Sequence, residues 1–244
     1  MTTRNKRTAL ITGASRGLGL ALVRELARRG WQLIIDARGE AALKDTYREL
    51  SEYTQVTAVA GDVTDRAHQR ALAAASRALG GLDAVVNNAS VLGPSPQPEL
   101  LSYPLPTLAE VFQANVIAPL GVLQAVQNTL KPGARIINVT SDAGVEAYEG
   151  WGGYGASKAA LEQLSAVLAE ENPGWRVYWV DPGDMRTQMQ QEAFPGEDIS
   201  DRPLPEASVP GFVALLEGDW PSGRYAARDI APGERVREAL EVVI

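Results

Sequence analysis

Tyr154 and Lys158 are the two residues of this chain whose types and spacing point most directly to chemistry. They lie four residues apart in a segment that we predict to be helical to about residue 170, so both side chains share one helix face, about 6 Å apart along the axis. A free tyrosine has a pKa of about 10, and a neighbouring positive charge lowers that value by favouring the phenolate. The pair therefore predicts a tyrosine that serves as an acid or a base.

Ser141 supplies a hydroxyl upstream of this pair, directly after the apolar run 135–140 that we expect to be a buried strand. From the end of that strand, the hydroxyl can hydrogen-bond the same substrate oxygen that Tyr154 protonates. A tyrosine and a lysine at this spacing are also common on solvated helix faces, so the interpretation depends on the rest of the chain.

A glycine loop near the start of the chain predicts a nucleotide site. Gly13, Gly17 and Gly19 follow a short apolar run at 8–12, and an amphipathic segment with a helical period comes after them. Glycines permit a tight turn and close backbone approach, and the N-terminus of the following helix offers free N–H groups to a pyrophosphate. The spacing is Gly-x3-Gly-x-Gly, which differs from the general Gly-x-Gly-x-x-Gly pattern.

These features, in this order and spacing, resemble the short-chain dehydrogenase/reductase family of the classical type. The likeness covers about residues 7–187, and its other motifs are Asp62-Val63, Asn87-Asn88-Ala89, Asn115, Ser141, Tyr154-x3-Lys158 and Pro182-Gly183. The chain departs from the family at Ser90, where glycine is common, and the added hydroxymethyl group is expected to constrain the backbone beside the nicotinamide.

The resemblance implies a catalytic set of Asn115, Ser141, Tyr154 and Lys158. Tyr154 would be the general acid in reduction, Lys158 would lower its pKa and hold the nicotinamide ribose, and Ser141 would polarise the carbonyl. Pro119 lies four residues after Asn115 and has no N–H, so the Asn115 carbonyl is expected to lose its helical partner and to accept a relay water. The alternative is a kinked packing helix with a buried, satisfied asparagine.

Charge near the second expected strand favours NADP(H) over NAD(H). Enzymes that use NAD place a carboxylate at the ribose 2′-hydroxyl, and by the family's spacing that position holds Ala37, followed by Arg38. Arg16 is a second guanidinium suited to a phosphate. Asp36 is discordant: strand alternation turns it away from Ala37, but a shift of one residue would favour NAD(H). The predicted cofactor residues are Gly13, Ser15, Arg16, Gly17, Leu18, Gly19, Ala37, Arg38, Asp62, Val63, Asn88, Ala89, Tyr154, Lys158, Pro182, Gly183, Met185 and Thr187.

Alternating strand and helix signals without a linker predict one α/β domain over residues 1–244. We expect a Rossmann fold, a doubly wound parallel sheet of about seven strands with helices on both faces. The strands are expected near 8–12, 32–37, 55–60, 84–88, 134–140, 176–180 and 223–227.

The composition limits the classes of function. The chain has no cysteine and one histidine, His68, so no metal site is expected, and His68 is predicted to be a solvated helix residue. The net charge of −7 argues against nucleic-acid binding. The N-terminus lacks a signal peptide, and no apolar run reaches the ~18 residues of a membrane span, so a cytoplasmic location without membrane contact is expected.

Residues 184–211 form a proline-rich stretch that closes over the substrate in the family. Its candidate substrate residues are Met189 and Phe194, and Tyr148 and Trp151 join them from the loop before Tyr154. An apolar lining favours a carbonyl or alcohol substrate with a hydrophobic body, unless the lid packs only on itself. A homodimer or a homotetramer is expected, with dimerisation through the helices at 108–130 and 154–170. The closing Asp-Gly-Gly of the family is missing, which weighs against tetramer contacts made by the tail.

We therefore predict an NADP(H)-dependent carbonyl reductase that is reversible as an alcohol dehydrogenase. The alternatives are an NAD-dependent alcohol dehydrogenase, a non-catalytic NADP(H)-binding redox sensor, and an epimerase or dehydratase that uses the same Tyr154 and Lys158.

Overall fold

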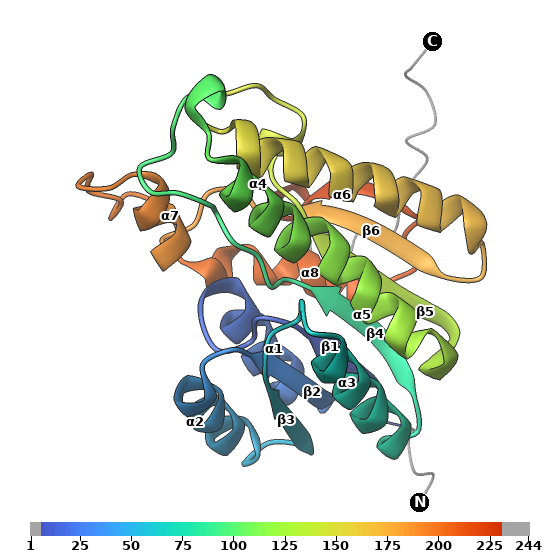
Figure 1. The fold of residues 1–244 in the computed structure, drawn as a ribbon. Coiled ribbons are helices and arrows are strands. Elements are labelled where there is room, and N and C mark those ends of the chain that lie inside the picture. Colours follow the sequence, from blue (N-terminus) through green and yellow to red (C-terminus); the bar gives the residue numbers. More distant parts are fainter. Residues whose placement is uncertain (1–5, 231–244) are drawn as a thin grey trace, which may run out of the picture.

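Seven parallel strands form one sheet in the order β3-β2-β1-β4-β5-β6-β7 (Figure 1). The computed structural model describes residues 6–230, so predictions for the two chain ends, including the tail contacts, lie outside the described residues. The strands are β1 (Thr8–Ile11), β2 (Gln32–Ala37), β3 (Val56–Ala60), β4 (Leu82–Asn87), β5 (Leu130–Val139), β6 (Arg176–Asp181) and β7 (Gly223–Ala226). The predicted doubly wound α/β fold is confirmed.

The strands of this sheet are short apolar runs because both faces of the sheet are covered. The expected boundaries agree to within two residues, except that β5 begins four residues earlier than predicted. Its first part contains Pro132 and Gly133, which interrupt the apolar pattern, and the pairing with β4 shifts register between Leu82 and Ala84.

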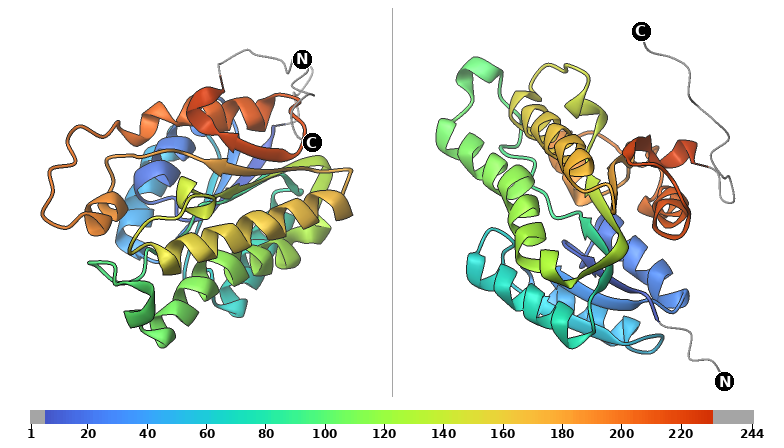
Figure 2. Two further views of the ribbon diagram at one scale, coloured as in Figure 1. Left: turned by 90° about the horizontal axis from the view of Figure 1, so that it is seen from above. Right: turned by 90° about the vertical axis from the view of Figure 1, so that its right-hand side faces the viewer.

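Helices cover both faces of the sheet (Figure 2). Helices α1 (Gly17–Arg28), α2 (Glu40–Leu50) and α8 (Val209–Glu217) share one buried apolar cluster, and α3 (Arg66–Ala78) and α5 (Ala118–Val126) share the other. Alternate residues of the inner strands enter the two clusters; in β2, Leu33 and Ile35 enter the first and Ile34 enters the second. Helix α6 (Gly152–Glu171) lies beside α4 (Leu105–Phe112) on the second face.

A π-helical turn, Gln113–Ile117, joins α4 to α5. Pro119 lacks the N–H that would bond the carbonyl four residues earlier, so the α-helical ladder is interrupted at Asn115. By length and composition alone, the stretch Leu105–Thr129 is long and apolar enough to cross a membrane, although the sequence shows no unbroken apolar run of that length. This is weak support for a span, because helices in the core of soluble proteins pass the same test.

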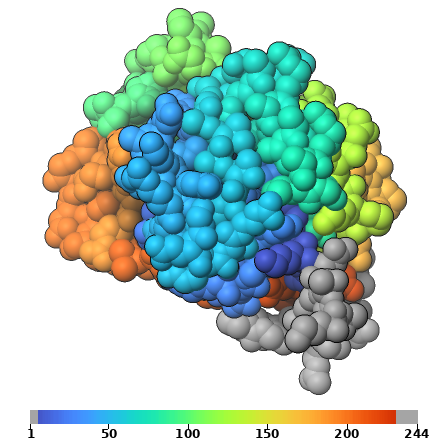
Figure 3. Space-filling model, turned by 90° about the horizontal axis from the view of Figure 1, so that it is seen from below, coloured from blue at the N-terminus to red at the C-terminus, as the bar shows by residue number. Residues whose placement is uncertain are grey.

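The carboxyl ends of β1, β4, β5 and β6 meet at one edge of the sheet, where the strand order reverses after β1. Ligands of open α/β folds bind at such an edge. The segment after β6, including the short helix α7 (Gln188–Ala193), overhangs it. Figure 3 shows this orange segment packed against the blue N-terminal part of the chain.

Candidate active site

The glycine loop has the backbone geometry of a cradle for an extended phosphate group. Gly13 and Gly17 have φ angles of +66° and +54°, which side chains other than glycine rarely adopt. A Cβ at Gly13 would lie 2.9 Å from Asn88 Nδ2, and one at Gly19 would collide with the Gly13 carbonyl. Helix α1 begins at Gly17 without a side-chain cap, so its first N–H groups are available to an anion. The loop fits the pyrophosphate of a dinucleotide.

Polar bonds fasten the glycine loop to the end of β4. The Thr12 hydroxyl accepts from the N–H groups of Asn88 and Ala89, both at 3.0 Å. Asn88 Nδ2 donates to the carbonyls of Thr12 and Gly13 at 2.9 and 3.1 Å. The glycine loop and the Asn87-Asn88-Ala89 motif are therefore held together by direct hydrogen bonds.

The predicted cations of the cofactor site lie at the surface. Arg38 is exposed, and Arg16 is exposed with its Nη1 donating to Gln188 Oε1 of α7 at 2.5 Å. Asp62 accepts from the Thr64 N–H and hydroxyl, both at 2.8 Å. Burial raises the pKa of Asp62, but these bonds and the nearby Arg38 bring it below its usual value.

Three other predicted cofactor residues point their side chains into the core. Leu18 and Ala37 enter the first apolar cluster and Val63 enters the second. Only the backbone of these residues is left for a cofactor. Ser15 is half-buried in the glycine loop.

The prediction that His68 is solvated is wrong. Its imidazole Nε2 pairs with Asp36 Oδ2, and the two side chains are only 5% and 1% exposed. Asp36 Oδ1 also accepts from the Gly13 N–H at 3.2 Å, and its carbonyl accepts from the Ala14 N–H at 2.8 Å. Helix α3 packs on the face of β2 that Asp36 occupies, so the solvated face expected at His68 lies against the sheet. Asp36 turns away from Ala37, as strand alternation predicts.

Tyr154 and Lys158 share one face of α6, and both are buried. Lys158 Nζ lies 5.3 Å from the centre of the Tyr154 ring and donates to the Val139 carbonyl at 2.8 Å. Burial lowers the pKa of Lys158 to about 8. Burial also raises the pKa of Tyr154, and the carboxylates of Asp181 and Asp142 raise it further. Contrary to the expectation from sequence, Lys158 is not among the groups that shift the Tyr154 pKa, because burial lowers its own pKa to about 8 and it loses its charge before the phenol ionises.

All four hydrogen-bonding positions that Asn115 offers from its side chain have partners. Its Oδ1 accepts from the Ser90 hydroxyl at 3.0 Å and from the Val91 N–H at 2.9 Å. Its Nδ2 donates to the Val91 carbonyl at 2.9 Å and to Ser157 Oγ at 3.0 Å. The Asn115 side chain is thus buried and fully hydrogen-bonded, and it connects the loop after β4 to α6, while the water expected at its backbone carbonyl stays a prediction.

Ser141 lies at the end of β5 and lines the same cavity as Tyr154. Its hydroxyl donates to Asp142 Oδ1 at 2.7 Å and accepts from the Ala143 N–H at 3.2 Å. To polarise a substrate carbonyl, this hydroxyl must turn away from Asp142.

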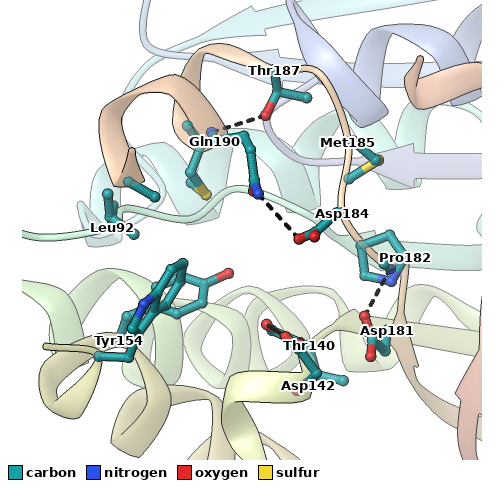
Figure 4. A pocket seen from close by; sticks show the side chains of 15 residues that line it. Leu92, Thr140, Asp142, Tyr154, Asp181, Pro182, Asp184, Met185, Thr187 and Gln190 are labelled. Atoms are coloured by element: carbon teal, nitrogen blue, oxygen red, sulfur yellow. Dashed lines mark hydrogen bonds between the residues drawn. The ribbon is translucent and has the colours of Figure 1, made fainter. Parts of the chain in front are cut away.

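A cavity of about 90 Å³ opens in front of Tyr154. Figure 4 shows Tyr154 on one side of it, with Asp184 and Gln190 of the overhanging segment on the other. The predicted residues Pro182, Gly183, Met185, Thr187, Trp151 and Met189 line this cavity.

Two of the four predicted substrate residues lie outside the cavity lining. Phe194 packs against Trp151, with ring centres 5.9 Å apart and the ring planes tilted by 48°. The Tyr148 hydroxyl donates to Glu146 Oε2 at 2.7 Å, with Asp142 Oδ2 a second acceptor within reach at 3.1 Å, and the residue lines a separate surface groove.

The structure adds residues that the sequence reasoning did not select. Asp142, Asp181 and Asp184 line the cavity, so its wall is more acidic than the expected apolar lining. Arg224 of β7 donates to Glu162 of α6 at 3.1 Å and to the Ser141 carbonyl at 3.2 Å. The first two aspartates adjoin predicted motifs, which was a usable signal, whereas residues as distant as Arg224 and Glu162 carry none.

Comparisons with known proteins place the chain among enzymes of a known family. The family model described as "short chain dehydrogenase" matches residues 7–198. A diacetyl reductase [(S)-acetoin forming] from Staphylococcus epidermidis is 34% identical over 252 residues, covering 91% of this chain and 97% of the relative.

Solved structures show the same relationship. A short chain dehydrogenase from Escherichia coli complexed with NADPH is 29% identical, with a TM-score of 0.83 over 91% of this chain and 96% of its own. NAD+-bound xylitol dehydrogenase shares the fold, with a TM-score of 0.79 at 23% identity over 93% and 98% of the two chains. The chain belongs to the short chain dehydrogenase family of oxidoreductases, whose fold binds a nicotinamide cofactor.

Proposed function

We propose that this protein is an NADP(H)-dependent carbonyl reductase, reversible as an alcohol dehydrogenase, with Tyr154 as its acid and base. The observation that carries the proposal is the Tyr154 phenol, buried at the wall of a cavity with Ser141 beside it and a raised pKa. A phenol with a raised pKa stays protonated at neutral pH, which is the form that reduction of a carbonyl requires. The related diacetyl reductase is named for the same class of reaction.

The cofactor would lie along the carboxyl edge of the sheet. Gly13, Ser15, Gly17, Leu18 and Gly19 would hold the pyrophosphate through their backbone, and the Asp62-Val63 and Asn88-Ala89 segments would hold the adenosine part. Tyr154 and Lys158 would bond the nicotinamide ribose, and Pro182, Gly183, Met185 and Thr187 would border the ring. When bound, the nicotinamide supplies or accepts the hydride.

NADP(H) is favoured by the charges at the end of β2. Arg16 and Arg38 are exposed and suited to a 2′-phosphate, because guanidinium groups bind phosphate through two parallel N–H donors. Asp36 supports the same choice, since its carboxylate is already engaged by Gly13 and His68. The complex of a related enzyme with NADPH adds support.

Tyr154, Ser141 and Asn115 have separate roles in the proposed reduction. Tyr154 donates its proton to the substrate oxygen, and Ser141 hydrogen-bonds that oxygen after its hydroxyl turns away from Asp142. Asn115 holds the loop after β4 against α6 by hydrogen bonds with Ser90, Val91 and Ser157.

The cavity suggests an uncharged substrate with an apolar part. Leu92, Trp151 and Met189 offer apolar surface, while Asp142, Asp181 and Asp184 add negative charge. No lysine or arginine is among the residues that line this cavity within the described chain. A carboxylate on the substrate would be repelled, so we propose neutral ketones or aldehydes.

Two further proposals concern assembly and location. The outer surfaces of α5 and α6 expose Leu120, Leu164 and Val167, which suits a homodimer through these helices. We infer a cytoplasmic location, consistent with a chain that has no cysteine and so no disulfide.

The test is to follow oxidation of NADPH and NADH by the purified protein across uncharged ketones, aldehydes and quinones. We expect turnover with NADPH on at least one uncharged carbonyl compound. A preference for NADH would contradict the phosphate assignment, and tight NADPH binding without any turnover would support a redox sensor instead.

A further inference from the structure

Ser90 is the position at which this chain departs from the glycine common in its family, and its side chain is engaged in the site. The hydroxyl donates to Asn115 Oδ1 at 3.0 Å. That oxygen also accepts from the Val91 N–H at 2.9 Å, and Asn115 Nδ2 donates back to the Val91 carbonyl. The loop after β4 therefore holds Asn115 by its backbone and, in addition, by the Ser90 side chain.

From Asn115 the contacts continue to the catalytic helix. Asn115 Nδ2 donates to Ser157 Oγ at 3.0 Å, and the Ser157 hydroxyl donates to the Tyr154 carbonyl at 2.6 Å. Asn115 is 1% exposed and Ser157 is fully buried, so water does not compete for these bonds. The position of Tyr154 is thereby linked to the loop that carries Ser90.

The side chain of Ser90 also acts on the Tyr154 phenol. Burial, followed by the carboxylates of Asp181 and Asp142, raises the pKa of the Tyr154 phenol, and a side-chain hydrogen bond with Ser90 is the contribution that lowers it. The charged groups that face this phenol are Asp142 after β5, Asp181 of β6 and Lys158 of α6.

We propose that Ser90 is a positioning residue of the active site, which ties Asn115 to the loop after β4 and partners the Tyr154 phenol. The proposal rests on the function proposed above. It gives the site a second hydroxyl besides Ser141, whose own proton is directed to Asp142 at 2.7 Å.

The proton count of a serine hydroxyl explains how Ser90 serves both neighbours. A hydroxyl donates one hydrogen bond and accepts two. While Tyr154 is protonated, Ser90 Oγ can accept from the phenol and donate to Asn115. After Tyr154 has given its proton to the substrate oxygen, Asn115 Oδ1 still keeps the bond from the Val91 N–H. The Ser90 hydroxyl is then free to rotate and donate to the phenolate, without losing its proton. Glycine offers neither bond.

The test compares Ser90→Gly, Ser90→Ala and Ser90→Thr, of which only the last keeps a hydroxyl. Ser102→Ala is the matched control, since Ser102 is an exposed serine outside the cavity. Proteins labelled with 3-fluorotyrosine report the hydrogen bonding of each phenol by fluorine NMR, and Tyr154→Phe assigns the resonance of Tyr154. This measurement needs neither cofactor nor substrate, so it stands even if no carbonyl compound is turned over.

We expect the Tyr154 resonance to shift in Ser90→Ala and Ser90→Gly and to stay near the wild-type position in Ser90→Thr and Ser102→Ala. In turnover, kcat/KM for reduction should fall about tenfold in the first two variants, the size of one neutral hydrogen bond, and should stay near the wild-type value in Ser90→Thr. A Tyr154 resonance that is unchanged in Ser90→Ala overturns the proposal. A role in folding alone would lower the melting temperature without moving the resonance, and would overturn it too.

Discussion

Removing the imidazole of His68 should destabilise the protein strongly, although this residue lies outside the catalytic site. His68→Ala leaves Asp36 Oδ2 without its partner at a position where the side chain is 1% exposed. The other oxygen keeps only the bond from Gly13 at 3.2 Å. A buried carboxylate that loses its partner cannot recover hydration, because the sheet and α3 enclose it.

The expected magnitude follows from this geometry. Breaking a buried pair by removing one partner costs about 3–5 kcal/mol, and the remaining Gly13 bond places Asp36 at the low end, about 3 kcal/mol. In a chain of this length, each kcal/mol lowers the melting temperature by about 2–4 °C. We therefore expect a loss of about 6–12 °C in His68→Ala.

Thermal and denaturant unfolding, followed by circular dichroism, measure this loss. Arg70→Ala, an exposed change on the same helix, should stay within about 0.5 kcal/mol of wild type. In the Asp36→Asn background, His68→Ala should cost at least about 1 kcal/mol less, because no charge is then left unpaired. A melting temperature of His68→Ala within about 2 °C of wild type would refute the reasoning.

Three further predictions concern the cofactor, a titration and the substrate. Arg38→Ser should weaken NADPH binding about 10–100-fold in calorimetric titration, because it removes a charge-assisted bond to the 2′-phosphate, and it should leave the affinity for NADH unchanged. The control Arg48→Ala should bind both cofactors as wild type does. Equal weakening of NADPH and NADH binding in Arg38→Ser would count against the prediction. The pKa of Lys158 is about 8 in the folded protein, against an ordinary value of 10.5 for lysine. Between those two pH values Lys158 is protonated in the unfolded chain but not in the folded protein, so the free energy of unfolding should rise with pH from about 8 by up to about 1.4 kcal/mol per pH unit. Denaturant titrations should show that Lys158→Met lacks this rise. Parallel curves of unfolding free energy against pH for the two proteins would contradict the prediction. Wild type should prefer the methyl ester of an oxo acid to the free acid, and Asp142→Asn should narrow that ratio of kcat/KM about tenfold; an unchanged ratio would remove Asp142 from substrate selection.

The sequence predicts the strands, the glycine loop and the catalytic pair better than it predicts the contacts among the side chains of the site. Buried parallel strands are apolar runs, and the glycine loop and the Tyr154–Lys158 pair depend on local spacing, so these features were predictable. Contacts between distant residues were not. The pairing of His68 with Asp36 spans 32 positions and depends on how α3 packs on β2.

The same limit applies within the catalytic pair itself. Spacing on α6 brought Lys158 to the Tyr154 ring, but the direction of its ammonium is set by the Val139 carbonyl of a neighbouring strand. The Ser90 departure was visible in the sequence, and only the position of Asn115 relative to the loop after β4 shows what its hydroxyl touches.

Transfer of deuterium from the cofactor to the product is the most direct test of the proposed chemistry. NADPH labelled with deuterium at its transferable position would be incubated with wild type and Tyr154→Phe on the best carbonyl substrate, and the product analysed by mass spectrometry. We predict one deuterium on the carbinol carbon with wild type, and almost none with Tyr154→Phe even though that variant still binds NADPH. A product without deuterium, or equal transfer by Tyr154→Phe, would contradict the role given to Tyr154 and the carbonyl reduction proposed for this protein.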